Sequence, residues 1–353
     1  MKFLNVLKSG SCLLALTLFV GCGQSGNQQS QDGGGQSGGG SGTGDPIAFV
    51  SNGVASFWTI AQKGVEQAGA DLGVPVAVHM PSGGITDQKR ILEDLITRGV
   101  AGIAVSPIDP VNQTELLNQV GEHTKLITAD SDAPDSNRLV YIGMDNYKAG
   151  RMCGELVKEA LPDGGKIMIF VGRLEQDNAR RRRQGVIDEL LGRDYNPANF
   201  DPPGNVLSGN GYEILGTLTD QFDFAKGKAN VEDTLSRHPD VAGMVGLFAY
   251  NPTLILEALE QAGKLREVKV IGFDEEGPCL QGIIDGTVHG TIVQNPFMYG
   301  YHSVEVLKKI IAGDTSVIPE DKFIDIPARH IRQDNVEEFW ADLKEKIGDE
   351  SAE

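Results

Sequence analysis

The stretch VKVIGFDEEGPCLQGIIDGTVHGTIVQNP, residues 268–296, decides the fold because it holds one complete strand–helix–strand unit. The apolar run at 268–271 predicts a short buried strand, and residues 277–284 predict a helix. An Asp-Gly turn then leads into a β-rich run over 287–293. Two strands joined through a helix predict neighbouring parallel strands of an α/β sheet.

Polar side chains follow both strands of this unit. Asp274 comes just after the first strand and Gln294 ends the second. Ligands of parallel α/β sheets bind outside the carboxyl ends of the strands. A carboxylate accepts hydrogen bonds and an amide both donates and accepts them, so this pair suits hydroxyl groups. The competing interpretation of Asp274 is that it only caps the following helix.

The same alternation runs through most of the chain and predicts an α/β fold of two doubly wound parallel-sheet lobes. Further strands are predicted at 47–50, 76–79, 102–105, 126–128, 139–142, 166–171, 213–219 and 243–247. Further helices are predicted at 57–72, 86–98, 111–121, 147–160, 179–191, 225–237 and 252–262.

Composition excludes several classes of partner and site. The net charge of -18 and the pI of about 4.7 argue against nucleic acid, since phosphate binding needs a basic face. Neither the cysteines nor the histidines have metal-ligand spacing, so no metal site and no cofactor are predicted. Cys153 and Cys279 fit either a disulfide or two buried thiols, and buried thiols are favoured.

The amino-terminus predicts export. Two lysines precede an apolar run at 13–20 that is too short for a membrane span, as in a signal peptide over residues 1–22. The run LTLFVGC resembles a bacterial lipobox, which implies lipidation of Cys22; a plain secretory signal cut nearby is the alternative. Residues 23–44 are mostly Gly, Ser and Gln and predict a tether. The protein is expected outside the cytoplasm, with the lipid as its only membrane attachment.

Other candidate ligand contacts also follow predicted strands or open predicted helices, so they are expected to share one rim with Asp274 and Gln294. They are Asn52, Phe57, Trp58, Asp130, Ser131, Arg182, Phe222, Tyr250 and Asn251.

With these residues in place, residues 46–327 resemble periplasmic sugar-binding proteins of the ribose-binding type, the substrate-binding components of ABC importers. The most specific motifs are Phe57-Trp58, ITAD, ARRRRQG, HPDVAG, EALEQAGK and VIGFDE with its following VQNP. The resemblance implies the type I periplasmic binding protein fold, with two lobes joined by a hinge of three crossings. The expected lobes are 45–144 with 296–323 and 145–295 with 324–335, followed by a charged tail, frayed at its end, over 336–353.

The resemblance also implies roles for individual residues. Phe57 and Trp58 are similar to the aromatic face that covers one side of the sugar ring, and Phe222 to the opposing face. Asp130 and Asp274 are similar to the carboxylates that accept from hydroxyls, Arg182 to a guanidinium donor, and Gln294 to a hydroxyl partner beside the hinge. Phe222 as part of a lobe core is the alternative, and the neighbouring arginines of the ARRRRQG run are expected on a solvated helix face.

Three positions depart from the ribose-type pattern. Ser131 stands where an Arg is usual and Ala55 where an Asn is usual, and the loop Phe248-Ala249-Tyr250-Asn251-Pro252 lacks the usual Asn-Asp pair. Ribose itself is therefore not expected. A larger or differently hydroxylated monosaccharide fits better, with Tyr250 or Asn251 supplying the lost polar contact.

The predicted function is capture of a monosaccharide-like sugar by a monomer and its delivery to an ABC permease driven by a partner ATPase, without catalysis. One alternative is a receptor of the same fold that feeds a chemoreceptor or sensor kinase, and another is a non-sugar ligand such as an autoinducer or nucleoside. A third is a sugar hydrolase that uses Asp130 and Asp274 as its carboxylate pair.

Overall fold

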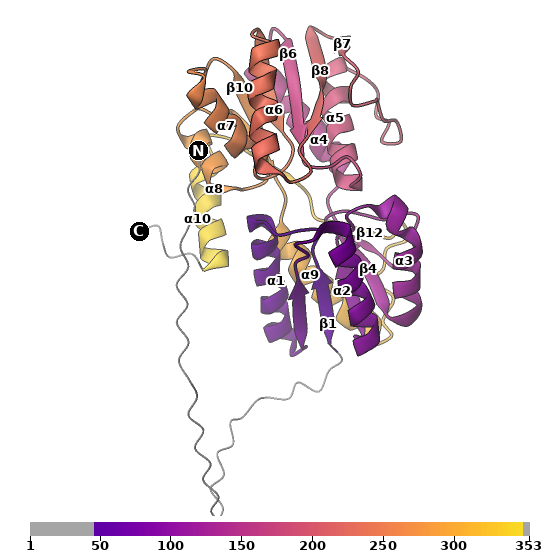
Figure 1. Ribbon diagram of the computed structural model, residues 1–353. Helices are drawn as coiled ribbons and strands as arrows, with labels where there is room; N and C mark the ends of the chain where they lie inside the picture. Colours follow the sequence, from indigo (N-terminus) through magenta and orange to yellow (C-terminus); the bar gives the residue numbers. More distant parts are fainter. Residues whose placement is uncertain (1–45, 349–353) are drawn as a thin grey trace, which may run out of the picture. The chain divides into compact units, whose positions relative to one another are not determined.

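The computed structural model describes residues 46–348, which form two α/β lobes (Figure 1). The signal peptide, Cys22 and the tether expected over residues 1–44 lie outside the described residues. Within the described part, none of the helices combines the length and the apolar character needed to cross a membrane.

The first lobe contains a six-stranded sheet in the order β12-β5-β4-β3-β1-β2, and all neighbours in it are parallel. Its strands are β1 (Ile47–Val50), β2 (Val76–His79), β3 (Gly102–Val105), β4 (Lys125–Ala129), β5 (Tyr141–Gly143) and β12 (Phe323–Asp325).

The second lobe repeats this arrangement in a seven-stranded sheet, in the order β13-β11-β10-β9-β6-β8-β7. Only the two edge strands are antiparallel to their neighbours, β7 to β8 and β13 to β11. Its strands are β6 (Gly165–Val171), β7 (Leu207–Gly209), β8 (Tyr212–Thr219), β9 (Val241–Gly246), β10 (Lys269–Phe273), β11 (Gly290–Val293) and β13 (Arg329–Ile331).

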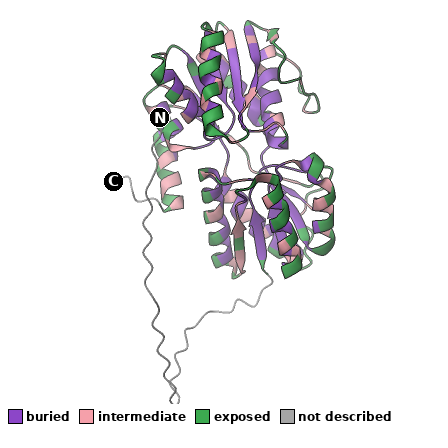
Figure 2. Cartoon of the chain, in the orientation of Figure 1, coloured by how far each residue is buried: buried purple, intermediate pink, exposed green. Residues whose placement is uncertain are grey.

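Helices cover both faces of each sheet, so every sheet packs into two apolar clusters. Figure 2 shows the result, with buried strands inside and helices whose outer surfaces are exposed. The first lobe carries α1 (Ser56–Leu72), α2 (Gly84–Arg98), α3 (Pro110–His123) and α9 (Pro296–Ile311). The second carries α4 (Asn146–Ala160), α5 (Asp177–Leu191), α6 (Phe224–Arg237), α7 (Asn251–Gln261), α8 (Gly277–Ile284) and α10 (Val336–Ile347).

The chain crosses between the lobes three times, between β5 and α4, between β11 and α9, and between β12 and β13. The second crossing returns α9 to the first lobe, where it packs on α1 and lies in orange among the indigo and purple elements of Figure 1. The α/β fold with two parallel-dominated sheets is confirmed. The expected boundary at 323 needs correction, because β12 pairs with β5 through Asp325 and therefore belongs to the first lobe.

The prediction of a charged tail over 336–353 is wrong for its first part, because α10 forms there and packs on α8. Val336 and Phe339 are buried in the second lobe, and Trp340 and Leu343 pack against the same cluster. These residues recur at helical spacing, so the helix buries an apolar stripe. The charged residues of the KEKIGDESAE end led to the prediction of a tail in place of this helix.

Candidate functional site

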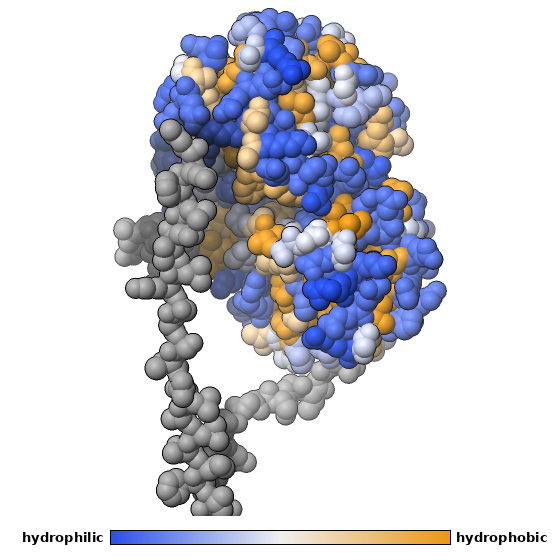
Figure 3. All heavy atoms as spheres, in the orientation of Figure 1, coloured by the Kyte–Doolittle hydropathy of each residue, from blue (hydrophilic) through white to orange (hydrophobic). Residues whose placement is uncertain are grey.

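Both lobes contribute side chains to one cavity of about 50 Å³. A single buried water needs roughly 10–15 Å³, so the space suits a small ligand. Figure 3 shows hydrophobic residues along the junction of the lobes, on a face that is otherwise mostly hydrophilic. The cavity is lined by Asn52, Ala55, Phe57, Trp58, Asp130, Gln176, Asn178, Arg182, Phe222, Phe248, Ala249, Tyr250, Asp274 and Gln294.

Asp130 presents the carboxylate of the first lobe directly after β4. Its backbone has a φ of 63°, its N–H donates to the carbonyl of Ile142 in β5 (3.0 Å), and its carbonyl accepts from the Tyr141 hydroxyl (2.8 Å). The carboxylate oxygen Oδ2 accepts from Ser106 Oγ at 3.0 Å and from Asn178 Nδ2 at 3.1 Å. Asp130 is therefore fixed by its own lobe and contacted by the other.

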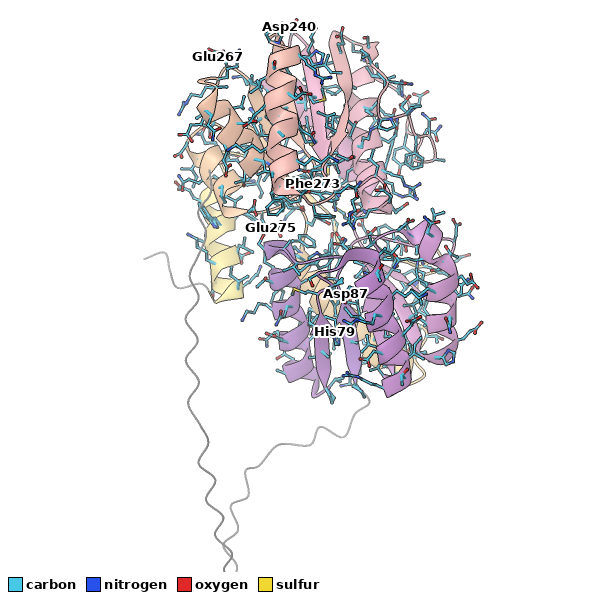
Figure 4. All side chains as sticks on the ribbon, viewed as in Figure 1. His79, Asp87, Asp240, Glu267, Phe273 and Glu275 are labelled. Atoms are coloured by element: carbon cyan, nitrogen blue, oxygen red, sulfur yellow. The ribbon has the colours of Figure 1, made fainter. Side chains whose placement is uncertain are left out.

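Asp274 occupies the equivalent place after β10 in the second lobe. Its φ is 68°, its N–H donates to the carbonyl of Ile292 in β11 (2.8 Å), and its carbonyl accepts from Thr291 Oγ1 (2.9 Å). Its Oδ1 accepts from Gln294 Nε2 at 2.7 Å. Figure 4 places the preceding residue, Phe273, at the edge of this lobe that faces the first, while Asp240 lies at the far end. Each lobe thus holds one carboxylate in the same local structure.

Arg182 lies between the two carboxylates and is 1% exposed. Its guanidinium is 3.6 Å from Asp130 and 4.0 Å from Asp274, and it lies over the Phe273 ring at 4.3 Å. Nε donates to Asn146 Oδ1 at 2.8 Å, which fixes its orientation. Glycine at position 150 makes this placement possible, since a Cβ there would collide with the Arg182 carbonyl as α4 passes α5.

Burial and the neighbouring groups shift the pKa of both carboxyls in opposite directions. It raises the pKa of Asp130, and the Arg182 charge and the Ser106 and Asn178 hydrogen bonds oppose the rise. Burial also raises the pKa of Asp274 to about 6, again against the Arg182 charge and the Gln294 hydrogen bond. In both cases the Arg182 cation and the neighbouring hydrogen-bond donors stabilise the ionised carboxylate and so oppose the effect of burial.

Aromatic side chains line the cavity from both lobes. Phe57 and Trp58 open α1 edge to face, with centroids 4.9 Å apart, and Trp58 Nε1 donates to Asn52 Oδ1 at 3.2 Å. In the second lobe, Phe222 lies 5.6 Å from the Phe248 ring. The lining therefore offers apolar faces beside the charged groups.

The buried carboxylate of Asp220 holds the aromatic side of the second lobe in place. It accepts from the Tyr250 hydroxyl at 2.5 Å and from the backbone N–H of Phe222 at 2.8 Å. Phe222 has a φ of 63°, a conformation that a bulky residue keeps only when its surroundings fix it. Asp220 is thus a positioning residue for both rings.

Nine of the eleven predicted ligand contacts line the cavity, and Ser131 and Asn251 do not. Ser131 follows a tight turn in which its N–H donates to the Ala129 carbonyl, and its side chain is fully buried. Asn251 begins α7, where its amide donates to Asp220 and accepts from the Phe248 N–H. The amide of Asn251 is hydrogen-bonded to protein groups and Asn251 lies outside the cavity lining, so its role as a ligand contact stays a prediction. Tyr250 does line the cavity, with its hydroxyl bonded to Asp220.

Five residues that line the cavity were missing from the predicted contacts. Ala55, Phe248 and Ala249 lie within two residues of a predicted contact, and Asn178 belongs to the first turn of the same helix as Arg182, so their places at strand ends and helix starts could have included them. Gln176 precedes α5 in a loop that has no periodic pattern, and no sequence signal marks it.

Neither cysteine takes part in the site. Cys153 and Cys279 are buried free thiols, and burial raises the pKa of the Cys279 thiol to about 12. Among residues 46–348, no group of three or more His, Cys, Asp or Glu side chains could hold a metal ion.

Comparisons with known proteins agree with this architecture. The model of the periplasmic binding protein domain matches residues 47–315. The ribose import binding protein RbsB of Salmonella typhimurium is 26% identical over 277 residues, which are 76% of this chain and 86% of that protein. The D-allose-binding periplasmic protein of Escherichia coli is 23% identical over 282 residues, 75% of this chain and 84% of that protein.

A solved structure extends the likeness to three dimensions. It is an ABC transporter solute-binding protein from Burkholderia graminis in complex with D-arabinose, 28% identical with a TM-score of 0.74. The superposition covers 82% of this chain and 96% of that chain.

Proposed function

The chain belongs to the periplasmic binding protein family, and from that premise we propose that it captures a monosaccharide outside the cytoplasm and delivers it to an ABC importer. Relatives named for ribose and allose, and the D-arabinose complex, support a monosaccharide as the ligand class. No catalytic step is part of this proposal.

The observation that carries the proposal is one cavity lined by a carboxylate and aromatic side chains from each lobe. A sugar ring has C–H faces that pack on aromatic rings, and its edge carries hydroxyls that donate to carboxylates. Asp130 and Asp274 are the proposed acceptors, Arg182 and Gln294 the proposed donors, and the rings of Phe57, Trp58 and Phe222 the proposed packing surfaces.

Lobe closure is the proposed mechanism. A ligand that touches both lobes binds the closed arrangement better than the open one and so shifts the population toward it. The three crossings form the hinge, and the closed arrangement is the form that the importer recognises. One monomer contains both halves of the site. Lipidation at Cys22 is the proposed means of keeping the protein at the membrane.

A thermal-shift screen tests the ligand class. The protein without residues 1–44 is screened against pentoses, hexoses, deoxy sugars, polyols, disaccharides and nucleosides. A ligand at 100 times its Kd adds about 2.7 kcal/mol of apparent stability. We expect one or a few monosaccharides to raise Tm, and Asp274→Asn to remove the shift. A shift with nucleosides alone, or with no carbohydrate, would contradict sugar binding.

A further inference from the structure

Gln176 is a fully buried side chain of the cavity whose amide has no hydrogen-bond partner in the protein. It is 0% exposed and lines the cavity, and neither its Nε2 nor its Oε1 has a hydrogen-bond partner in the protein. Buried amides are almost always paired, because an unpaired donor or acceptor loses its bonds to water without compensation.

The other polar side chains of the cavity are already paired inside the protein. Asp274 accepts from Gln294, Asn52 accepts from Trp58, and the Tyr250 hydroxyl donates to Asp220. Among the described residues that line the cavity, buried side-chain atoms without a partner occur only on Gln176 and at Nη2 of Arg182. The unmet hydrogen-bonding capacity of the site is therefore concentrated on these two residues.

A role for the Gln176 side chain in starting α5 does not account for its position. Gln176 occupies the N-cap, but its side chain makes no capping hydrogen bond. Its backbone carbonyl accepts from the Arg180 N–H at 3.2 Å, which any residue could do. The following Asp177 pairs with Arg181 at 2.6 Å, away from Gln176. The side chain of Gln176 is left for the cavity.

The amide has one donor group and one acceptor at the same place. A hydroxyl both donates and accepts, and two hydroxyls on adjacent carbons can satisfy both ends of the amide. An apolar group or a ring hydrogen would leave the amide unpaired in the bound state as well. The chemistry that fits Gln176 is therefore a hydroxyl, or a vicinal pair of hydroxyls, on the ligand.

We propose that Gln176 is a specificity-determining residue that recognises a hydroxyl group of the bound sugar and discriminates against the analogue that lacks it. This inference rests on the proposed function and adds to it, because it selects among monosaccharides by one hydroxyl. Gln176 contacts the ligand from the second lobe, beside Asn178, which contacts Asp130 of the first lobe.

Gln176→Met tests the inference, because methionine has nearly the same length and no strong hydrogen-bonding group. The best-binding sugar is chosen from D-ribose, D-arabinose, D-allose, D-xylose, D-glucose and D-galactose by isothermal titration calorimetry. We expect the variant to bind it about ten- to a hundredfold more weakly. Without sugar, Tm of the variant should be unchanged or higher, since an unpaired buried amide has been removed.

Monodeoxy analogues of that sugar identify the contact. Wild type should discriminate strongly against one analogue, and Gln176→Met should bind the parent and that analogue alike while still discriminating at the other positions. Gln67→Met, on the exposed surface of α1, is the matched control and should behave as wild type.

Three results would overturn the inference, and they can be told apart. If wild type binds a sugar but Gln176→Met keeps both its affinity and its full pattern of discrimination, Gln176 does not recognise a hydroxyl and the proposed function stands. A uniform loss of affinity with unchanged discrimination also overturns it, in favour of a structural role. If wild type binds none of the six sugars, the proposed function itself fails and this inference fails with it.

Discussion

Asn178 of the second lobe donates a hydrogen bond to the Asp130 carboxylate of the first lobe over 3.1 Å, and both residues line the cavity. The contact between the lobes is thus made by a proposed ligand-binding group. Closing the lobes therefore also brings the Asn178 amide to the Asp130 carboxylate, which orients that carboxylate for the ligand.

Asn178→Asp should favour the open arrangement, because two carboxylates would then face each other at the distance of a hydrogen bond. We expect a larger radius of gyration for the ligand-free variant by small-angle X-ray scattering, and weaker sugar binding. Asn199→Asp makes the same charge change at an exposed loop position and serves as the control. Equal radii for the two variants would show that this contact does not hold the lobes together.

Sugar affinity should fall as pH drops below about 6. Burial raises the pKa of Asp274 to about 6, and a hydroxyl donates to its ionised form. The ligand therefore favours the deprotonated carboxyl, binding releases a proton, and Kd rises at lower pH by at most tenfold per pH unit for this group. Titration calorimetry at pH 7.5, 6.5 and 5.5 measures it. Asp274→Asn should bind more weakly with a flatter pH profile, and a constant Kd in wild type would contradict the assignment.

Arg182→Met should destabilise the protein by about 3–5 kcal/mol at pH 7.5, because it leaves two buried carboxylates without their cation. The loss in free energy of unfolding should be smaller at pH 5. Without the Arg182 charge, the native pKa values of Asp130 and Asp274 rise further above the unfolded value of about 3.9. Between those values the native state binds more protons than the unfolded state, so the free energy of unfolding rises as pH falls.

Urea unfolding of this variant at the two pH values measures the change. Arg237→Met, whose side chain is 72% exposed on α6, is the control and should match wild type. The same deficit at pH 5 and pH 7.5 would mean that Arg182 stabilises the protein by packing alone.

Phe339→Ala should lower the free energy of unfolding by about 3 kcal/mol, because the ring is buried in the second lobe as part of α10. Glu338→Ala, at the exposed neighbouring position, should leave it within about 0.5 kcal/mol of wild type. Chemical unfolding followed by circular dichroism distinguishes them. If both substitutions are neutral, α10 is not part of the folded lobe.

Local rules predicted most of the fold and part of the site. Asp274 and Gln294 lie in the cavity as expected, because the carboxyl ends of parallel strands meet at one edge whatever the details of packing. Ser131 was predicted from its neighbour Asp130, but the turn at Asp130 carries it into the lobe instead. Such a turn depends on backbone torsion, which the residue types do not reveal.

Two other failures came from tertiary contacts. The helix α10 was missed because the charged end of the chain favoured a tail, whereas its apolar residues pack against the second lobe. Gln176 was missed because its position is significant only once the first lobe closes over it. The apolar residues of α10 do recur at helical spacing, whereas no periodic pattern marks Gln176.

The carboxylates at the strand ends have the same local structure in both lobes. Asp130 and Asp274 share the strand position, the left-handed backbone and the hydrogen bond to the next strand, but Ser131 follows one and Glu275 the other. This pair of carboxylates can accept hydrogen bonds from the hydroxyls of any polyol. Selectivity among sugars then depends on positions that differ between the two lobes. Substitutions at such positions, for example at Gln176, could change the preferred sugar while Asp130 and Asp274 stay the same.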